Sequence, residues 1–340
     1  MLTTGYSEYT LRDVRLQSGQ TLPEIKLAYR LYGELNRKRD NLVVFPTYFT
    51  GRHDSNAPYF GAGRALDPAR HCILVPCLIG NGESSSPSTL EGPSGGAAFP
   101  HVSVHDNVRL QHALIEAVCP VERIALVIGW SMGGMQTYEW VTQFPDLVEA
   151  ALPFCATARC SPHNFVFLEG VKAALRADQA WQDGQYSAPP RKGLRAFGRA
   201  YAGWAYSGAF FDDGLYRDLG FTDLEALLRD WEDDHLSWDA NDLLHKIRTW
   251  QQADVSANDT YKGDFAAALG AVTSRMIVMP SSSDMYFSAR QSEQEAAKIR
   301  NADFRPFVSD LGHCACTPSK PDPRFMAFLD KAIIELLAPN

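Results

Sequence analysis

The sequence of 340 residues lacks the features that would indicate a membrane or a nucleic-acid partner. No apolar stretch approaches the ~20 residues that a helix needs to cross a bilayer. The net charge is −8 and no block of like charges occurs. We therefore expect no membrane-binding face and no nucleic-acid partner. Residues 1–7 also lack a basic start followed by an apolar run, so no secretory signal is expected.

The cysteines and glycines are not arranged for a disulfide framework or a nucleotide site. The seven cysteines are odd in number and scattered, and several of them, such as Cys72 and Cys155, stand within apolar runs. This usage is typical of reduced thiols and favours a cytoplasmic location. The glycines at 61, 63, 80 and 82 do not follow a strand in a G-x-G-x-x-G frame, so no dinucleotide site is expected.

What the sequence does contain is a series of short strands that alternate with helices. Two runs with alternating polarity, 9–16 and 22–32, predict an opening hairpin. Wholly apolar runs, typical of strands covered on both faces, follow at 41–45, 71–78, 124–128 and 148–155, with further strands at 275–280 and 304–308. Helices are expected at 102–118 and 325–337. The pattern predicts an α/β protein with a mostly parallel sheet and helices on both faces.

Between the two groups of strands the character of the sequence changes. From residue 157 to 266 the apolar β-branched runs give way to aromatic residues and charged helical segments. Helices are expected there at 164–176, 193–205, 223–234 and 241–253. We interpret 157–266 as a helical lid inserted into a core domain formed by 1–156 and 267–340.

One segment carries the pattern of a catalytic nucleophile. In residues 124–140 an apolar strand meets Gly129-Trp130-Ser131-Met132-Gly133, and a helix-compatible run follows. This is G-x-S-x-G between a buried strand and a helix, the nucleophile elbow. Glycine suits both positions because the turn is too tight for side chains there. Ser131 is therefore the predicted nucleophile.

A serine nucleophile needs a base and an orienting acid, which follow it in the order Asp or Glu and then His in this arrangement. The strand at 275–280 leads into Asp284, and the strand at 304–308 leads into His313. Of the nine histidines, His313 alone stands after the last strand in this order. Asp310 competes with Asp284 for the acid, although no separate strand presents it.

The oxyanion of an acyl-transfer intermediate needs two backbone N–H donors. The residue after the nucleophile, Met132, is the first expected donor. The second should come from the loop after the strand at 41–45, where we favour Tyr48 over its neighbour Thr47.

The nucleophile segment and several other motifs resemble the homoserine O-acetyltransferase family of α/β hydrolases. The segment is GWSMGGMQ at 129–136, and the similarity covers nearly the whole chain. Other matching positions are Arg64-Ala65-Leu66-Asp67, Gly80-Asn81-Gly82, Phe99-Pro100, Asp239-Ala240-Asn241 and Ser283-Asp284. The resemblance implies an α/β-hydrolase fold, a triad of Ser131, Asp284 and His313, and dimers formed through the lid.

The chain departs from that family directly after the predicted base. In the acetyltransferases an aspartate that meets the substrate's amino group follows the histidine, whereas Cys314 stands here. The family also has a lid arginine for the substrate carboxylate and a tyrosine two helical turns later, which implies Arg199 and Tyr206 as substrate contacts. The pair Gly129-Trp130 looks more like a branch of short-chain acetyl esterases, and we expect Trp130 to contact the substrate.

These features leave three functional hypotheses, of which hydrolysis is favoured. In the first, an acetyl or other short-chain ester acylates Ser131 and water releases the acyl group. In the second, acetyl-CoA acylates Ser131 and homoserine or another small hydroxyl compound accepts the group. In the third, the fold only binds a ligand. The sequence His313-Cys314-x-Cys316 lacks a suitably spaced fourth ligand, so neither a metal nor any other cofactor is expected.

Overall fold

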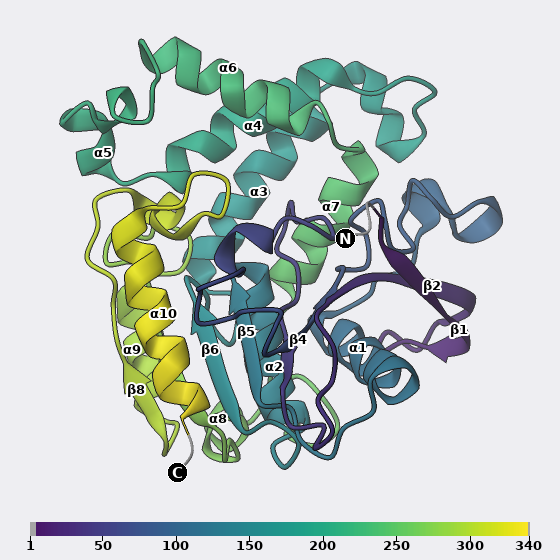
Figure 1. Cartoon of the computed structure of the whole chain (residues 1–340). Coiled ribbons are helices and arrows are strands. Elements are labelled where there is room, and N and C mark those ends of the chain that lie inside the picture. The colour runs from purple at the N-terminus through teal and green to yellow at the C-terminus, as the bar shows by residue number, and fades with distance from the viewer. Residues whose placement is uncertain (1–4, 339–340) are drawn as a thin grey trace.

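An eight-stranded sheet forms the centre of the computed structural model, which describes residues 5–338 (Figure 1). Its spatial order is β1-β2-β4-β3-β5-β6-β7-β8. The hairpin strands β1 and β2 are antiparallel, and the strands from β4 to β8 are parallel to one another, which confirms the predicted mostly parallel sheet. The strands are β1 (Ser7–Arg15), β2 (Thr21–Tyr32), β3 (Leu42–Val44), β4 (Cys72–Pro76), β5 (Leu126–Trp130), β6 (Ala150–Phe154), β7 (Arg275–Val278) and β8 (Ala302–Phe304).

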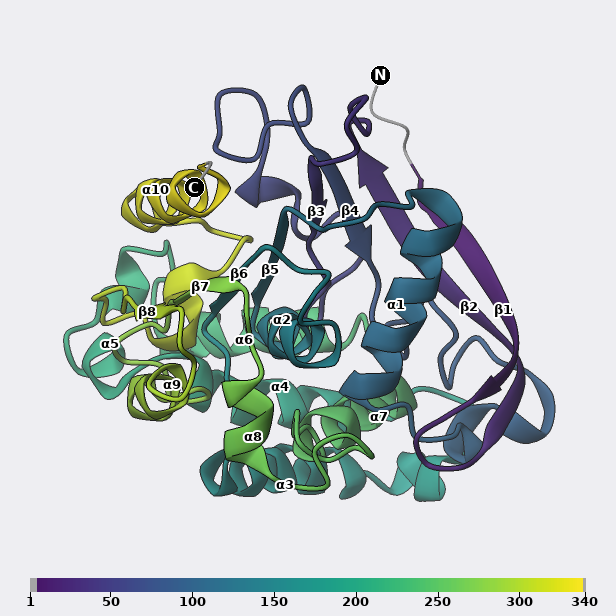
Figure 2. The same cartoon turned by 90° about the horizontal axis from the view of Figure 1, so that it is seen from below.

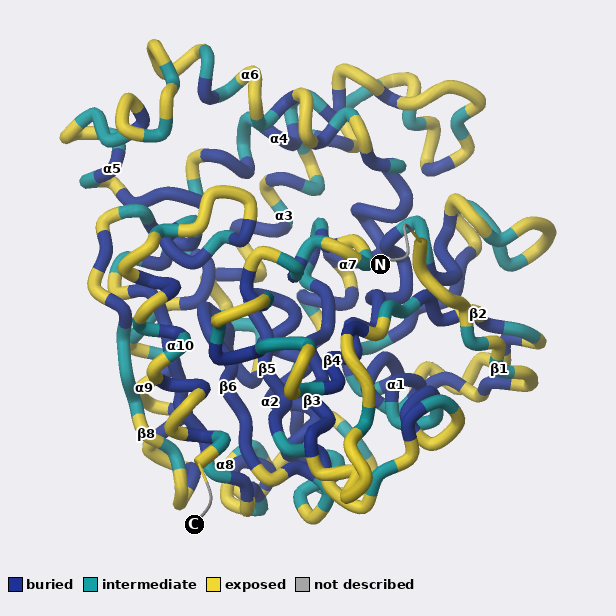
Figure 3. The backbone as a smooth tube through the Cα atoms, in the orientation of Figure 1, coloured by how far each residue is buried: buried dark blue, intermediate teal, exposed yellow. Residues whose placement is uncertain are grey.

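Successive side chains of the central strands pack into two different apolar clusters. Val127 on β5 belongs to the cluster on one face of the sheet, whereas its neighbours Leu126 and Ile128 belong to the cluster on the other. This alternation follows from the period of two along a strand. Every residue of β3, β4, β5 and β6 is buried (Figure 3), because helices cover both faces.

The covering helices divide between the two faces of the sheet (Figure 2). Side chains from α1, α2, α8 and α9 contribute to the first cluster, and those from α10 to the second. These helices are α1 (Val104–Val118), α2 (Met132–Gln143), α8 (Phe265–Gly270), α9 (Ala289–Ala296) and α10 (Pro323–Leu337). The chain therefore has the three-layered α/β architecture predicted from its sequence.

Five of the six α-helices between β6 and β7 form a layer over one end of the sheet (Figure 1). They are α3 (Pro162–Arg176), α4 (Arg191–Ala205), α5 (Gly208–Asp212), α6 (Leu224–His235) and α7 (Ala240–Gln251). A third apolar cluster joins them to Phe49, Leu78 and the start of α2 at Met132 and Met135. We call this layer the lid. Its predicted limits, 157 and 266, remain predictions, and α8 spans the second of them.

Some element boundaries differ from the prediction. The last strand was expected at 304–308 but ends at Phe304, and only an isolated bridge joins Phe307 to Ser281. Phe307 N–H still donates to the Pro280 carbonyl at 2.8 Å, and Val308, the next residue, is 78% exposed. The sequence pattern did not predict the short helices α5, α8 and α9.

No helix in the described part of the chain is long and apolar enough to cross a membrane. The expectation of no secretory signal rests in part on residues 1–4, which lie outside the described residues. All seven cysteines are free thiols.

Candidate active site

Ser131 occupies a strained turn between β5 and α2. Its backbone has φ 56° and ψ −127°, a conformation that L-residues adopt rarely and that costs ~1–3 kcal/mol. The Ser131 N–H donates to the carbonyl of Phe154 at 3.1 Å, which fixes the turn to the adjacent strand. The turn thus holds Ser131 at the carboxyl end of β5, as expected of a nucleophile elbow.

The glycines on either side of Ser131 allow this turn. A Cβ on Gly129 would lie 2.2 Å from the carbonyl oxygen of Gly133, and a Cβ on Gly133 would lie 2.6 Å from the carbonyl oxygen of Pro46. Both clashes are with backbone, which cannot swing away. The requirement for glycine is therefore one of close approach, because neither residue has a positive φ.

His313 and Asp284 form a hydrogen-bonded pair. His313 Nδ1 and Asp284 Oδ2 are 2.7 Å apart, and both side chains are buried. The other carboxylate oxygen, Oδ1, accepts from the backbone N–H groups of Tyr286 at 2.8 Å and Phe287 at 3.0 Å. These contacts hold the carboxylate toward the far nitrogen of the ring and leave Nε2 as the nitrogen available to Ser131.

Asp310, the alternative acid, is exposed, and its backbone carbonyl accepts from the Ser207 hydroxyl. The structure therefore brings Asp284, and not Asp310, to the imidazole.

A cavity of about 660 Å³ lies between the sheet and the lid, and Ser131 and His313 both line it. The lid contributes Tyr201, Tyr206 and Trp231. Gly312 allows the lid to pack against the loop of His313, because a Cβ there would lie 2.7 Å from the Ala205 carbonyl oxygen. Further polar residues at this cavity include Arg52, Asp233, Asp234 and Lys320.

The backbone around the cavity offers two N–H groups for an oxyanion. Met132 is the first residue of α2, so its N–H has no partner within the helix. Thr47 N–H already donates to the Pro76 carbonyl at 3.1 Å. Tyr48 N–H has no acceptor among the residues that the structure describes. This arrangement favours Tyr48 over Thr47 as the second donor.

Two of the three expected substrate contacts line the cavity and one does not. Trp130 and Tyr206 are among the lining residues. Arg199 instead lies on α4 with its guanidinium bound to Glu225 and Glu232 of α6, at 2.7 Å in each case. The expectation that Arg199 binds the substrate is therefore corrected. Its guanidinium is already paired with two carboxylates of the lid.

Cys314, which follows the predicted base, lies at the cavity beside Tyr206. Burial raises the pKa of the Cys314 thiol to about 12, although a hydrogen bond with Tyr206 acts in the opposite direction. The thiol is therefore neutral near pH 7. The site thus offers no negative charge at the position directly after the base.

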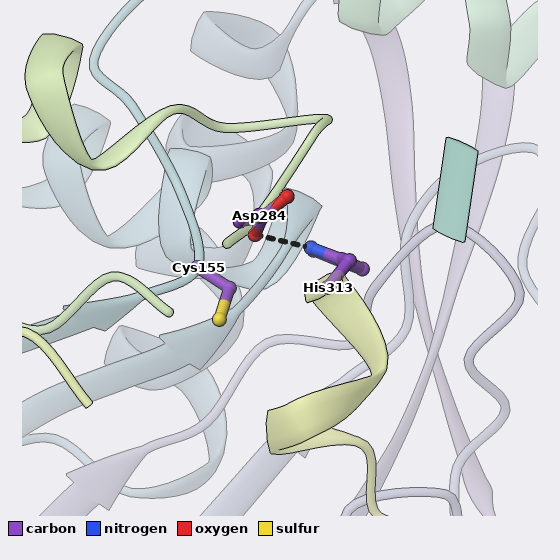
Figure 4. A group of neighbouring side chains, drawn as sticks. All are labelled: Cys155, Asp284 and His313. Carbon is purple, nitrogen blue, oxygen red and sulfur yellow. Dashed lines mark hydrogen bonds and ion pairs between the residues drawn. The ribbon is translucent and has the colours of Figure 1, made fainter. Parts of the chain in front are cut away.

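A second thiol, that of Cys155, is fully buried beside Asp284 and His313 (Figure 4). Ligand atoms of Cys155, Asp284 and His313 all lie within 4.8 Å of one another, close enough to suggest a metal site. However, His313 Nδ1 is already bonded to Asp284, and burial raises the pKa of the Cys155 thiol well above its ordinary value. A metal ion would have to displace the proton between His313 and Asp284 and also the proton of the Cys155 thiol. The arrangement suits a buried Asp–His pair better than a metal centre.

The sequence reading missed several aromatic residues around the site. Phe49, Trp238 and Tyr286 line the cavity, and the ring of Phe287 lies 5.6 Å from that of His313 in a tilted arrangement. Phe49 and Tyr286 lie within two residues of predicted site residues, which was an available signal. Trp238 gave no such signal, because its place depends on how the lid packs.

Comparisons with known proteins identify the family of the chain. Residues 41–317 match the model of the alpha/beta hydrolase fold family. The chain belongs to the α/β hydrolase family. Among its α/β-hydrolase relatives, the ethyl acetate hydrolase of Pseudomonas veronii is 36% identical over 327 residues, covering 95% of this chain and 93% of that protein.

Two further comparisons cover most of the chain. The crystal structure of the acetyl esterase MekB superposes with a TM-score of 0.94 at 35% identity, covering 98% of this chain and 97% of that one. The homoserine O-acetyltransferase of Chlorobium chlorochromatii (strain CaD3) is 30% identical and covers 87% of each chain. The resemblance found in the sequence motifs is thus confirmed.

Proposed function

We propose that this α/β hydrolase is a serine esterase that hydrolyses acetyl and other short-chain carboxylic esters. The observation that carries the proposal is the hydrogen bond between Asp284 and His313. His313 lines the same cavity as Ser131, which the strained turn after β5 holds in place. The similarity to an ethyl acetate hydrolase and to an acetyl esterase over nearly the full chain supports the choice of substrate.

In the acylation step, His313 Nε2 takes the proton from the Ser131 hydroxyl as its oxygen attacks the ester carbonyl carbon. The carbonyl oxygen becomes an oxyanion, which accepts from the N–H groups of Met132 and Tyr48. The C–O bond to the alcohol then breaks, and His313 gives its proton to the departing alkoxide. Asp284 holds the ring and stabilises its charged form.

In the deacylation step, His313 removes a proton from water, which attacks the acetyl group on Ser131. The same two N–H groups hold the second oxyanion. Collapse of this intermediate releases acetate, and His313 returns the proton to Ser131. The protein's own groups supply every proton transfer, so we propose that the reaction uses no cofactor.

The alternative acceptor is a small hydroxyl compound such as homoserine, with acetyl-CoA as the acetyl donor. The similarity to a homoserine O-acetyltransferase favours it. Two features of the site favour water instead. Cys314 places a neutral thiol after the base, and Arg199 is bound to Glu225 and Glu232 rather than facing the cavity.

The experiment follows the acetyl group. The purified protein is incubated with p-nitrophenyl acetate and, separately, with acetyl-CoA and homoserine. We expect rapid release of p-nitrophenol and acetate in the first reaction, and little O-acetylhomoserine in the second. Accumulation of O-acetylhomoserine with negligible ester hydrolysis would reverse the assignment. A Ser131→Ala variant tests the third hypothesis, since a protein that only binds a ligand would keep its biological activity.

We further propose that the protein is cytoplasmic and forms a homodimer through the lid. The free thiols and the family resemblance motivate these two proposals. Light scattering of the purified protein tests the second: the mass of a dimer is expected, and the mass of a monomer over the working concentration range would contradict it.

A further inference from the structure

Trp130 lies with the face of its indole against the catalytic imidazole. The ring centroids of Trp130 and His313 are 4.9 Å apart and the planes are inclined by only 20°. Two other aromatic rings approach His313, but at steeper angles: Tyr286 at 49° and Phe287 at 41°. Trp130 is therefore the ring that presents its π face to the imidazole.

The same indole contacts the predicted oxyanion loop. The rings of Tyr48 and Trp130 are 4.6 Å apart at 68°, an edge-to-face arrangement. Trp130 is 7% exposed, and its Nε1–H finds no hydrogen-bond partner in the described part of the chain. Its orientation is thus set by packing between two parts of the catalytic machinery, and the N–H contributes nothing to that orientation.

We propose that Trp130 is a positioning residue that stabilises the charged form of His313 during both steps. This inference rests on the proposed ester hydrolysis and extends it. When His313 takes a proton from Ser131 or from water, the ring becomes a cation. A cation over an indole face is attracted by the negative face of the π system. The stack also limits rotation of the ring away from Ser131.

The pH test of this proposal depends on which titratable groups surround His313. They come from separate elements: Asp284 and Tyr286 from the loop after β7, Cys155 from the end of β6, and Cys314 from the loop of His313 itself. Burial raises the pKa of Cys155 and Tyr286 well above their ordinary values and that of Cys314 to about 12. None of these three becomes charged between pH 5 and pH 8, so none of them adds a titration to a pH profile over that range.

The test compares Trp130→Leu with Trp130→Phe on p-nitrophenyl acetate across pH. Leu removes the π face, whereas Phe keeps a smaller one and loses no hydrogen bond. We expect Trp130→Leu to lower kcat roughly tenfold with KM changed less than about twofold. The acid limb of kcat/KM should move to lower pH by about half a unit, because the imidazolium loses a stabilising contact. Trp130→Phe should recover most of both changes.

Phe325→Leu is the matched control, since it removes a buried aromatic ring that packs against Phe154 and Phe307 and not against the imidazole. Its acid limb should coincide with that of the wild type. Thermal melting of each variant identifies a loss of folding, which would lower the active fraction but would not move the limb. A rise in KM for Trp130→Leu with an unchanged pH profile would overturn the proposal in favour of simple substrate contact. Failure of the wild type to hydrolyse the ester would instead overturn the proposed function.

Discussion

At the scale of single residues, the chemistry depends on which carboxylate orients His313. Asp284 approaches Nδ1 at 2.7 Å and is itself held by two backbone N–H groups. We expect Asp284→Asn to lower kcat by ~10³–10⁴, because an amide at this position favours the wrong tautomer and cannot stabilise the imidazolium. Steady-state kinetics with p-nitrophenyl acetate measure the change.

Asp310→Asn is the control for that substitution. Its side chain is exposed, so its kcat should lie within about twofold of the wild-type value. Comparable losses in both variants would contradict the assignment of the acid.

The order of residues in the sequence was enough to propose Ser131, Asp284 and His313, because each follows a strand and the strands of a parallel sheet end at one edge. It was not enough for Arg199. Its spacing from Tyr206 matched the family, but its partners Glu225 and Glu232 lie on another helix. The packing of one helix against another decides which of its side chains faces a cavity. No local sequence pattern specifies that packing.

At the scale of elements, the elbow depends on the space around its glycines. Gly129→Ala is expected to destabilise the protein by about 1–3 kcal/mol or more, because the new methyl group would meet backbone atoms of Gly133 at 2.2 Å. Denaturant unfolding measures this change.

Gly170→Ala provides the matched comparison for the elbow substitution. Gly170 lies within α3, and a Cβ there would meet nothing within 4 Å. Alanine should therefore stabilise that helix by about 0.5–1 kcal/mol. Equal effects of the two substitutions would show that the close approach at the elbow has no energetic consequence.

Helix α9 carries a buried acid that should make stability depend on pH. Glu295 Oε2 accepts from the Ala158 N–H at 2.8 Å and Oε1 accepts from Gln291 Nε2 at 2.9 Å, yet burial raises its pKa to about 7. Between its ordinary value of 4.5 and 7 the folded protein binds more protons than the unfolded chain. Stability must therefore fall as the pH rises through this range.

Glu295→Gln removes that titration and tests the account of the buried acid. The stability of the wild type relative to this variant should fall by a few kcal/mol from pH 4.5 to pH 8. Urea unfolding of both proteins at several pH values measures it. A difference that is the same at every pH would contradict the raised pKa.

Wholly apolar runs predicted the central strands correctly, whereas segments with few apolar residues were predicted less well. The central strands were found because all their residues are apolar. Helix α9, with the sequence ARQSEQEA, was missed because it has little apolar periodicity and begins at the cap of Ser288. The last strand was placed too late because Phe304 and Phe307 suggested one extended run, although Pro306 separates them.

At the scale of the whole molecule, the cavity exists only where the lid meets the sheet. Its aromatic lining comes from segments far apart in the chain, so the sequence predicted a lid but neither the shape of the cavity nor the place of Trp238. The ion pairs of Arg199 help to join two lid helices, α4 and α6.

Arg199→Ala therefore tests whether this residue serves the lid or the substrate. The KM for p-nitrophenyl acetate should not change, and the melting temperature should fall by no more than about 3 °C, since the pairs are partly exposed. Arg199 lowers the pKa of Glu232, so its stabilising effect is present at neutral pH and is lost as the pH falls toward 4 and below. A large rise in KM would restore Arg199 to the substrate site.

The central claim is that Ser131 passes its acyl group to water. The most direct measurement supplies p-nitrophenyl acetate together with homoserine and determines how the acetyl group divides between acetate and O-acetylhomoserine. The account predicts that acetate takes nearly all of it and that Ser131→Ala abolishes both products. Predominant O-acetylhomoserine, or undiminished acetate release by Ser131→Ala, would contradict it.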